Sequence, residues 1–327
     1  MIIVPNSIEN EEELKDILNG SSSSFRNIRL YDRSVFVVEG APPEVPANMG
    51  YVLRGGLSSR EFKKNNTRVK VGNVEIGGSS LVIAAGPCAV ESRDQLITIA
   101  QEVRRRGANM LRGGAFKPRT SPYSFQGLGF QGLKYLKEAS DITGMPVVSE
   151  ILDPADYTGF ADTVDMLQIG SRNSQNFALL KFAGSQEKPV LLKNGMGNSL
   201  GEWLGSAEYI LSGGNQNVVL CYRGIRSFET ATRFTMDSGT IVSAGIVSHL
   251  PVCADPSHPA GRRDLVEPLA LAAVAAGATM LEVEVHNDPD HALSDAEQQI
   301  TLEQFDRLAK NVRSLHELIN SRVPATF

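Results

Sequence analysis

Residues 81–113, LVIAAGPCAVESRDQLITIAQEVRRRGANMLRG, decide the fold of this chain. They begin with an apolar run, Leu81–Pro87, and end with a second one, Met110–Gly113. Between the two lies Asp94–Arg106, an amphipathic stretch of more than ten residues. Short apolar runs that alternate with amphipathic stretches are typical of strands joined by helices. This segment therefore predicts one βα unit and the strand that opens the next.

The same alternation continues to the end of the chain, and eight units can be counted. The other strands are expected at Pro146–Ser149, Met166–Ile169, Pro189–Leu192, Val218–Tyr222, Pro251–Ala254 and Met280–Val285. Further helices are expected over Gly129–Ile142, Gln175–Ala183, Leu200–Ser212, Arg263–Ala276 and Leu302–Ile319. A (β/α)8 TIM barrel needs about 250 residues. The 327 residues therefore favour an α/β fold, a TIM barrel with a small appendage.

The first sixty residues have another pattern, which predicts a small N-terminal α+β domain. Ile2–Val4 is apolar, Glu11–Leu18 is an acidic helical stretch, and two strand-like runs, Ile28–Tyr31 and Ser34–Val38, flank a turn at Asp32–Arg33. A ferredoxin-like βαββαβ domain would need a second helix after these strands. That position is taken by the proline-rich segment 41–49, which is too broken to predict a helix.

A hairpin is expected between this domain and the barrel. Arg68–Val71 and Val74–Ile76 surround Gly72–Asn73, which is a two-residue hairpin signal. We expect the hairpin to cap the floor of the barrel. The expected division is therefore an N-terminal domain over 1–60, a linker with the hairpin over 61–80, and a barrel over 81–327.

Composition excludes several classes of protein. The chain is 42% hydrophobic and 21% charged, which is ordinary for a globular protein. Its net charge of −5 argues against nucleic acid or a membrane surface as a partner. The N-terminus lacks a signal-peptide pattern and no apolar run is long enough for a membrane span, so a cytoplasmic location is expected. The three cysteines do not form a secreted disulfide framework, and Cys221 and Cys253 are expected in the core.

Cationic side chains follow the predicted strands at their carboxyl ends, where active sites of this barrel class are built. They are Arg112, Lys117, Arg119, Arg172, Lys193 and Arg223. A lone Arg or Lys is more often a solvated surface charge. Six that converge repel one another unless anions bind, and guanidinium groups match phosphate and carboxylate oxygens. The sequence therefore predicts ligands that carry several negative charges.

A second group combines a thiolate, an imidazole and two carboxylates. Cys88, His258, Glu284 and Asp295 lie far apart in sequence but near the same predicted rim. Cys88 alone would more often be a small buried hydrophobe. Together the four favour a divalent metal site for manganese, iron, zinc or cobalt. The nearby Asp255 either orients His258 or forms a turn in ADPSHP, and both interpretations stay open.

From about Arg60 to its end the chain resembles the 3-deoxy-D-arabino-heptulosonate 7-phosphate (DAHP) synthases, in particular the microbial type Iβ branch. The motifs that carry the resemblance are GPCAVES (86–92), LRGGAFKPRTSPYSFQGLG (111–129), QIGSRNSQNF (168–177), LLKNG (191–195), RGIRSFE (223–229), DPSHPAGRRDLV (255–266), EVEVH (282–286) and ALSDAEQ (292–298). The resemblance implies condensation of phosphoenolpyruvate with erythrose 4-phosphate, the first step of the shikimate pathway.

The resemblance also implies roles for individual residues. Arg172, Arg223 and Ser171 would bind the phosphate of phosphoenolpyruvate, and Arg112 and Lys193 its carboxylate. Lys117 would lie between the substrates, Arg119 and Thr120 would bind erythrose 4-phosphate, and Asp255 would lie among the substrate-binding residues. Cys88, His258, Glu284 and Asp295 match the family's metal ligands. Glu150 and Lys193 are a hypothesis from chemistry: an acid and a base near one water can move its proton.

Two other functions remain open at this point. The related 3-deoxy-manno-octulosonate 8-phosphate synthases use arabinose 5-phosphate, although the segment KPRTS, residues 117–121, favours the shorter sugar. A barrel that only senses a phosphorylated metabolite is the other alternative. The resemblance further implies a homotetramer, with tyrosine or phenylalanine as an effector at the N-terminal domain. A domain that serves only assembly is the alternative to regulation.

Overall fold

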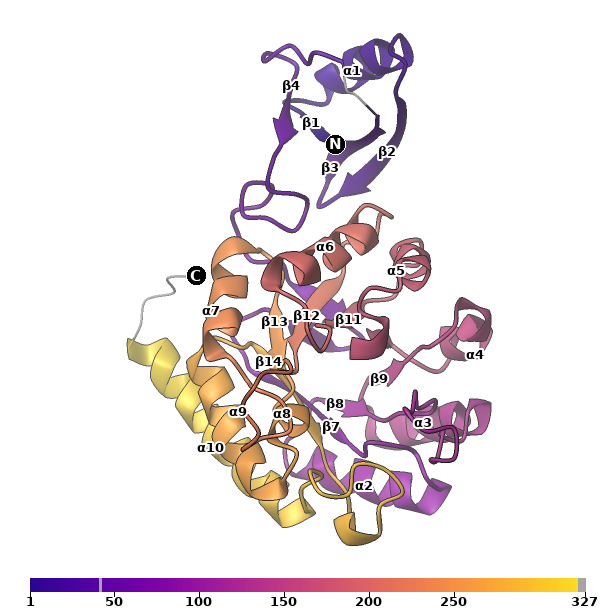
Figure 1. The fold of residues 1–327 in the computed structure, drawn as a ribbon, viewed down its shortest axis with the longest axis vertical. Coiled ribbons are helices and arrows are strands. Elements are labelled where there is room, and N and C mark those ends of the chain that lie inside the picture. The colour runs from indigo at the N-terminus through magenta and orange to yellow at the C-terminus, as the bar shows by residue number, and fades with distance from the viewer. Residues whose placement is uncertain (41–42, 323–327) are drawn as a thin grey trace.

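Eight parallel strands form a closed barrel in the computed structural model, which describes residues 1–40 and 43–322 (Figure 1). The barrel closes where the last strand pairs with the first, with Glu284 opposite Gly86. Its strands in chain order are β7 (Val82–Gly86), β8 (Met110–Arg112), β9 (Val147–Glu150), β10 (Met166–Ile169), β11 (Val190–Lys193), β12 (Val218–Tyr222), β13 (Val252–Ala254) and β14 (Met280–Glu284). The predicted (β/α)8 TIM barrel is confirmed.

Helices surround the barrel on its outside (Figure 1). They are α2 (Arg93–Arg105), α3 (Phe130–Thr143), α4 (Tyr157–Ala161), α5 (Phe177–Gly184), α6 (Leu200–Leu211), α7 (Ser238–Val247), α9 (Val266–Ala275) and α10 (Leu302–Arg322). A short helix, α8 (Ser257–Ala260), follows β13. The expected helix over Arg263–Ala276 is divided, because Arg263–Leu265 forms a 3-10 turn before α9 begins. No helix of the described residues has the length and apolar character needed to cross a membrane.

Helix α2 illustrates why the predicted pattern holds. The Ser92 side chain accepts a hydrogen bond from the Gln95 amide at its N-terminus, as an N-cap does. Its buried face is formed by Leu96, Ile99 and Val103, which recur at helical spacing. Two basic residues in its last turn complement the helix dipole.

The hairpin expected at the barrel floor consists of β5 (Val69–Val71) and β6 (Val74–Ile76). Gly72 in its turn has a φ of +56°, a conformation that glycine adopts without strain. The apolar residues of the hairpin join one buried cluster with side chains from the barrel strands, which include both Cys221 and Cys253. The cap on the floor and the core positions of the two cysteines are confirmed.

The N-terminal residues form a four-stranded antiparallel sheet and one helix. The elements are β1 (Ile2–Pro5), α1 (Glu9–Asn19), β2 (Ser24–Leu30), β3 (Arg33–Glu39) and β4 (Gly50–Leu53), and the strand order is β2-β3-β1-β4. The turn between β2 and β3 falls at Tyr31 and Asp32, one residue before the predicted position. Strand β4 was not expected. Residues 41–42 of the proline-rich segment lie outside the described residues, and residues 43–49 contain no helix.

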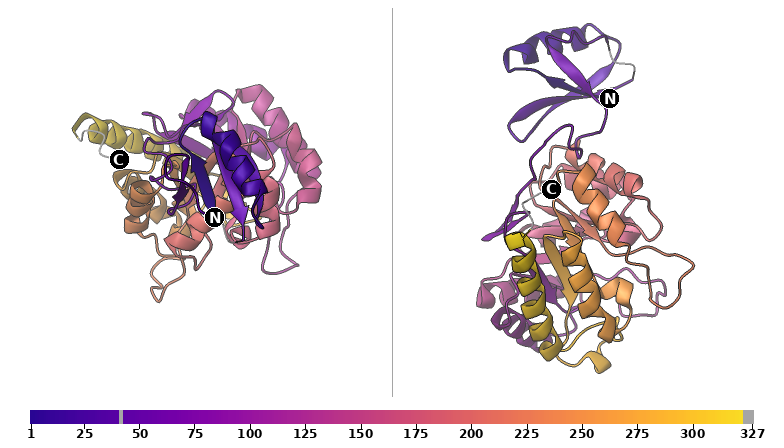
Figure 2. Two further views of the ribbon diagram at one scale, coloured as in Figure 1. Left: turned by 90° about the horizontal axis from the view of Figure 1, so that it is seen from above. Right: turned by 90° about the vertical axis from the view of Figure 1, so that its left-hand side faces the viewer.

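This N-terminal unit contacts the end of the barrel at which the strands begin (Figure 2). The Tyr31 amide donates to Gln216 Oε1 at 2.5 Å, and Gln216 lies just before β12. The carboxylate of Glu208, near the end of α6, accepts hydrogen bonds from the Leu57 and Ser58 amides, both at 2.7 Å. The unit therefore lies at the opposite end of the barrel from the carboxyl ends of its strands.

Candidate active site

A cavity of about 490 Å³ opens at the carboxyl ends of the strands. All six of the expected cations line it, together with Arg226 and Arg233. Among the described residues only Glu150 and Asp295 contribute carboxylates to its wall, and His258 lies at the same rim. The cavity therefore has a surplus of positive charge, as the strand-end pattern predicted.

Arg112 and Lys193 are buried on the floor of the cavity, where carboxylates from β14 and from the end of β13 pair with them. Arg112 lies 3.4 Å from Glu282 and 3.3 Å from Glu284. The Lys193 ammonium lies 2.7 Å from both Asp255 and Glu282. Burial alone would lower the pKa of Lys193, but the two carboxylates outweigh it and hold this pKa well above its usual value. Both side chains are therefore fixed as cations.

Arg223 and Arg172 form the second cationic pair. The Arg223 guanidinium stacks 3.8 Å above the ring of Phe234. Its Nη1 is buried without a hydrogen-bond partner among the described residues. Burial lowers the pKa of the Arg223 guanidinium to about 10. Arg172 follows β10 in the turn Ser171–Asn173 and donates to Thr120 Oγ1 at 3.3 Å. A buried guanidinium donor without an acceptor is costly unless an anion binds to it.

The loop after β8 brings the KPRTS segment across the cavity. Lys117 donates to Cys88 Sγ at 3.2 Å and to the Cys88 carbonyl at 3.1 Å. Arg119 lies 3.9 Å from Asp295. Glycine is needed at position 114, because a Cβ there would lie 2.7 Å from the Cys88 carbonyl oxygen of the backbone. The loop therefore joins the cation group to the thiol-carboxylate group.

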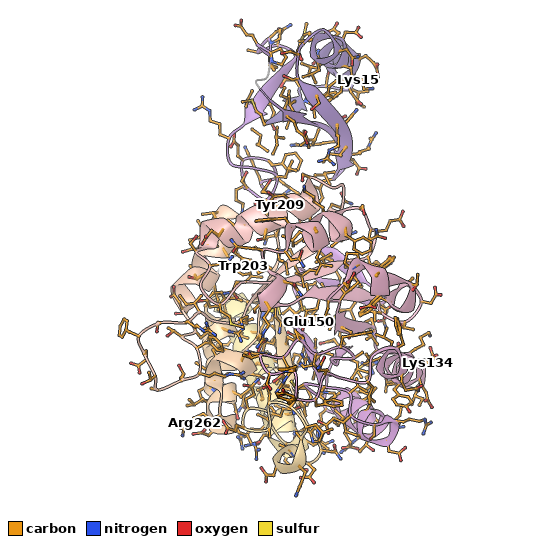
Figure 3. All side chains as sticks on the ribbon, turned by 45° about the vertical axis from the view of Figure 1, so that its right-hand side comes forward. Lys15, Lys134, Glu150, Trp203, Tyr209 and Arg262 are labelled. Carbon is orange, nitrogen blue, oxygen red and sulfur yellow. The ribbon has the colours of Figure 1, made fainter. Side chains whose placement is uncertain are left out.

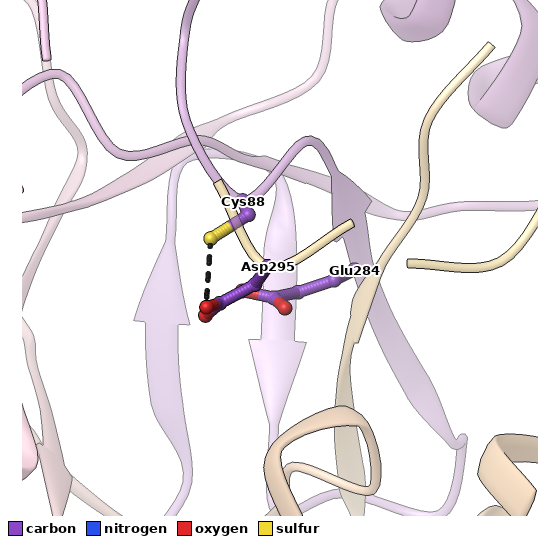
Figure 4. Close-up of side chains that lie close together, drawn as sticks. All are labelled: Cys88, Glu284 and Asp295. Atoms are coloured by element: carbon purple, nitrogen blue, oxygen red, sulfur yellow. Dashed lines mark hydrogen bonds between the residues drawn. The ribbon is translucent and has the colours of Figure 1, made fainter. Parts of the chain in front are cut away.

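Cys88, Glu284 and Asp295 meet beside these cations (Figure 4). Their ligand atoms lie within 4.8 Å of one another, and Cys88 Sγ lies 3.6 Å from Asp295 Oδ2. Burial, followed by the charge of Glu284, raises the pKa of Cys88 to about 12. Asp295 has a φ of +47°, in the left-handed region that few residues other than glycine, asparagine and aspartate visit. A mixed thiol and carboxylate set of this size fits a divalent transition metal.

His258, the fourth expected ligand, lies at the edge of this cluster. Its Nε2 is 3.8 Å from Glu284 Oε1, and its Nδ1 is 2.5 Å from Asp255 Oδ2. Asp255 also accepts a hydrogen bond from the His258 amide at 3.1 Å. The contacts therefore fit both interpretations of Asp255, as a partner of the imidazole and as a turn residue. Asp255 is buried beneath the cavity and contacts Lys193 and His258.

Glu150, labelled in Figure 3, ends β9 and lines the cavity. It packs directly against Gly170, where an added Cβ would lie 1.9 Å from Glu150 Oε1. This oxygen is buried and has no hydrogen-bond partner among the described residues. Burial raises the pKa of Glu150, although Lys117 and Lys193 oppose that effect. A carboxylate held in this way can accept a proton at a pH above its usual range.

Sequence reasoning missed three loop residues at this site, Arg226, Arg233 and Gln298, as well as Glu282 in β14. Arg226 lies within the RGIRSFE motif, but it follows the strand end by several residues. Arg233 comes from the same long loop and reaches within 3.5 Å of Asp295. Gln298 is buried and donates to Glu284 Oε2 at 2.6 Å. Two of the three lie in motifs that the sequence displays, and only their place in loops concealed them.

A model of the DAHP synthetase I family matches residues 61–321. The chain belongs to the DAHP synthetase I family. The match covers the linker, the hairpin and the barrel. The N-terminal unit lies outside it.

Among curated relatives, the phospho-2-dehydro-3-deoxyheptonate aldolase of Thermotoga maritima is 50% identical over 267 residues, which are 82% of this chain and 79% of that protein. The 2-dehydro-3-deoxyphosphooctonate aldolase of Nitrobacter hamburgensis is 31% identical over 276 residues, or 79% of this chain and 96% of that one. The sequence identity to the heptonate relative, 50%, is therefore well above that to the octonate relative, 31%.

The fold extends the similarity to the N-terminal unit. The crystal structure of the Thermotoga maritima phospho-2-dehydro-3-deoxyheptonate aldolase superimposes with a TM-score of 0.79 at 42% identity, and covers 97% of both chains. A truncated form of the 3-deoxy-D-arabino-heptulosonate 7-phosphate synthase from the same organism gives a TM-score of 0.75 and covers 80% of this chain. This chain therefore shares its architecture, the N-terminal unit included, with the full-length Thermotoga maritima protein.

Proposed function

We propose that this protein condenses phosphoenolpyruvate with erythrose 4-phosphate and water to give 3-deoxy-D-arabino-heptulosonate 7-phosphate and phosphate, the first step of the shikimate pathway. The observation that carries the proposal is the cavity with eight cations beside a thiol-carboxylate cluster, in which a buried donor of Arg223 has no acceptor from the part of the chain that the structure describes. Two phosphorylated anions would supply the charge that this cavity lacks. Family membership and the Thermotoga maritima relative agree with this reaction.

Phosphoenolpyruvate would bind at the deeper cations. Arg172 and Arg223 would hold its phosphate, with Ser171 beside them, and Arg223 Nη1 would gain its acceptor. Arg112 and Lys193 would hold its carboxylate. Their existing partners, Glu282 and Asp255, fix the two side chains before the substrate arrives.

Erythrose 4-phosphate would bind toward the mouth, at the loop after β8. Arg119 and Thr120 line the cavity there, and the Thr120 hydroxyl contacts Arg172. Lys117 would lie between the two substrates, because it reaches from the sugar-binding loop to Cys88.

A divalent ion of manganese, iron, cobalt or zinc is proposed at Cys88, His258, Glu284 and Asp295. Three of the four place ligand atoms within 4.8 Å of one another, and the mixed donor set suits these metals. When bound, the metal supplies Lewis-acid polarisation of the aldehyde oxygen. Asp255 would hold the His258 ring in its orientation through the Nδ1 contact.

Glu150 and Lys193 are proposed to hold the water that adds at C2 of phosphoenolpyruvate, and Glu150 to take up its proton. Both line the cavity, Glu150 at the end of β9 and Lys193 at the end of β11. Glu150 would accept the proton, because burial raises its pKa toward the working range. Lys193 would remain a cation, because its two carboxylate partners hold its pKa high.

The test is phosphate release from phosphoenolpyruvate with erythrose 4-phosphate and with arabinose 5-phosphate, before and after treatment with a chelator. We expect faster turnover with erythrose 4-phosphate, loss of activity with the chelator, and recovery with Mn²⁺. Faster turnover of arabinose 5-phosphate would make the chain an octulosonate synthase. Binding of phosphoenolpyruvate without turnover of either sugar would make it a metabolite-binding barrel.

The N-terminal unit, residues 1–60, is proposed to bind an aromatic amino acid, tyrosine or phenylalanine. It contains a cavity of about 260 Å³ between β1, α1 and the β2-β3 turn. Glu11 and Arg29 offer opposite charges to an amino acid, while Ile8 and Tyr51 offer apolar surface to a ring. Steady-state inhibition by each amino acid tests the assignment. Homotetramer assembly, the remaining family expectation, is tested by light scattering of the intact chain.

A further inference from the structure

Gln298 is the buried neutral side chain that links the proposed metal ligands to the cation group. It lies in the loop between β14 and α10 and is 1% exposed. We infer that Gln298 is a positioning residue for the metal centre, which sets the orientation of the Glu284 and Asp295 carboxylates. The inference rests on the proposed function, because it concerns the same metal site.

The side-chain amide of Gln298 faces carboxylates with its nitrogen and a guanidinium group with its oxygen. Its Nε2 donates to Glu284 Oε2 at 2.6 Å and lies 3.4 Å from Asp295 Oδ2. Its Oε1 accepts a hydrogen bond from Arg233 Nη1 at 2.7 Å. The carboxylates need a donor and the guanidinium needs an acceptor, so the amide has only one orientation that satisfies both.

An amide also suits this position better than any charged group. A third carboxylate here would repel Glu284 and Asp295, and a lysine would compete with a metal cation for them. The amide supplies hydrogen-bond donors without net charge. It therefore holds two anionic ligands close together while leaving their charge available.

Each oxygen of Glu284 consequently has its own neighbours. Oε2 accepts from Gln298, whereas Oε1 lies 3.3 Å from Arg112 Nη1 and 3.8 Å from His258 Nε2. A carboxylate with partners on both oxygens cannot rotate freely. Gln298 thereby determines which oxygen of Glu284 is turned toward the imidazole.

The loop that carries Gln298 is itself tied to the barrel. The next residue, Gln299, accepts from the Cys88 amide at 2.9 Å and donates to the Ser294 carbonyl at 2.8 Å. The Ile300 amide donates to the Glu284 carbonyl at 3.0 Å. Gln299 therefore holds the Cys88 backbone, while Gln298 contacts the carboxylates of Glu284 and Asp295. Both glutamines follow Asp295, whose backbone has a left-handed conformation.

Removing the amide is expected to weaken metal binding while the barrel stays folded. Loss of a group that orients metal ligands typically lowers metal affinity by about ten- to a hundred-fold. Gln298→Met keeps the size of the side chain but has neither donor nor acceptor. Gln298→Asn keeps the amide but shortens its reach, and is the milder change for folding.

The experiment measures the Mn²⁺ affinity of the metal-free full chain by competition with a fluorescent chelator. The control is Gln304→Met, because Gln304 accepts only from the Thr301 amide at the start of α10. Melting temperatures of the metal-free proteins show that each variant is folded. Co²⁺ absorption in the thiolate charge-transfer region reports whether Cys88 still binds.

We expect both Gln298 variants to bind Mn²⁺ about ten- to a hundred-fold more weakly than the wild type, and Gln304→Met to bind like the wild type. Unchanged Mn²⁺ affinity in either folded Gln298 variant overturns the inference and leaves the proposed metal centre intact. A wild-type chain that binds no Mn²⁺ overturns the metal centre and the inference together. Turnover of phosphoenolpyruvate and erythrose 4-phosphate, measured separately, tests the reaction.

Discussion

At the scale of single residues, the charges in the cavity depend on the two-residue period of β14. Glu282 and Glu284 point to the same side of this strand, and there they meet Arg112 and Lys193 from β8 and β11. Buried ions are tolerated only when such partners are present. The floor of the site therefore keeps its charges and their positions in the absence of substrate.

Glu150→Gln tests the proton-transfer role of Glu150. Burial raises the pKa of this carboxyl, so it takes up a proton as the pH falls, at a pH above its usual value. The deprotonated Glu150 carboxylate is the active form, so kcat of the wild type should fall as the pH drops through the pKa of Glu150. Glu150→Gln should lower kcat by about a hundred-fold, and kcat of this variant should no longer fall at acidic pH. The kcat-pH profile is the measurement, with the exposed Glu297→Gln as control. Full turnover of Glu150→Gln would remove the assignment.

Gly170→Ala tests the same carboxylate by displacement. The new Cβ would lie 1.9 Å from Glu150 Oε1, so the carboxylate has to move. We expect kcat to fall by about a hundred-fold, as with Glu150→Gln. Gly201→Ala is the control, since a Cβ there meets nothing within 4 Å. Normal kcat in Gly170→Ala would show that the position of Glu150 is not needed for turnover.

The six expected cations all line the cavity because position at a strand end is visible in sequence. Arg226, Arg233 and Gln298 were missed because they reach the site from loops that fold back over it. The course of such loops depends on tertiary contacts, for example the pairing of Ile225 with Thr235 and of Val285 with Ile300. Sequence periodicity carries no signal for these pairings.

At the scale of elements, most helices around the barrel were predictable, including the largely apolar α5 and α9, but α7 and α4 were not. Helix α7, SGTIVSAGIV, contains two glycines and several β-branched residues, so its intrinsic helix propensity is low. Helix α4 has only five residues. Strand β4 is four residues long and follows a proline-rich segment. Packing against the barrel or the N-terminal sheet decides these elements.

The segment before β13 carries a buried histidine whose contacts define its tautomer. His249 Nε2 lies 2.7 Å from the Leu57 carbonyl, so this nitrogen is the donor. Nδ1 lies 2.8 Å from Thr67 Oγ1 and accepts from the hydroxyl. Burial, with small contributions from Lys63 and Arg60, lowers the pKa of His249 to about 4. Neutral His249 therefore fastens the linker to the barrel.

His249 makes the stability of the fold dependent on pH. The unfolded chain takes up a proton near the ordinary histidine pKa of about 6.5, whereas the folded chain resists until about pH 4. Unfolding therefore binds a proton between these values, and stability is complete above pH 6.5 and falls as the pH drops toward 4. The loss is expected to reach about 3 kcal/mol at most.

Urea unfolding between pH 4 and 7 measures this effect. His249→Gln is the matched variant, because glutamine offers one donor and one acceptor but does not titrate. Its stability should change less with pH than that of the wild type over this interval. Equal pH dependence in both proteins would exclude His249 as the cause.

At the scale of the whole molecule, the N-terminal unit lies at one end of the barrel (Figure 2). The cavity lies at the other end, where the strands end. Helix α6 connects the two ends. Glu208 near its last turn holds the linker amides, and Trp203 donates to the Leu192 carbonyl, one residue before Lys193. An effector that moves the linker would therefore act on an element that contacts the strand bearing Lys193.

Gln216→Ala tests this connection. The substitution removes the 2.5 Å hydrogen bond from the Tyr31 amide and loosens the contact between the two units. Inhibition by tyrosine or phenylalanine should become several-fold weaker, which is about 1 kcal/mol of coupling, while uninhibited kcat stays normal. Gln186→Ala is the control, because Gln186 bonds only near its own helix end. Undiminished inhibition in Gln216→Ala would exclude this contact from the regulatory path.

Crystals of the full chain soaked with Mn²⁺ and phosphoenolpyruvate test the central claim most directly, by anomalous diffraction at the manganese edge. The predicted result is one strong peak bounded by Cys88, His258, Glu284 and Asp295, with the phosphate of phosphoenolpyruvate at Arg172 and Arg223. A manganese peak away from these four side chains, or phosphoenolpyruvate bound outside the cavity, would contradict the account.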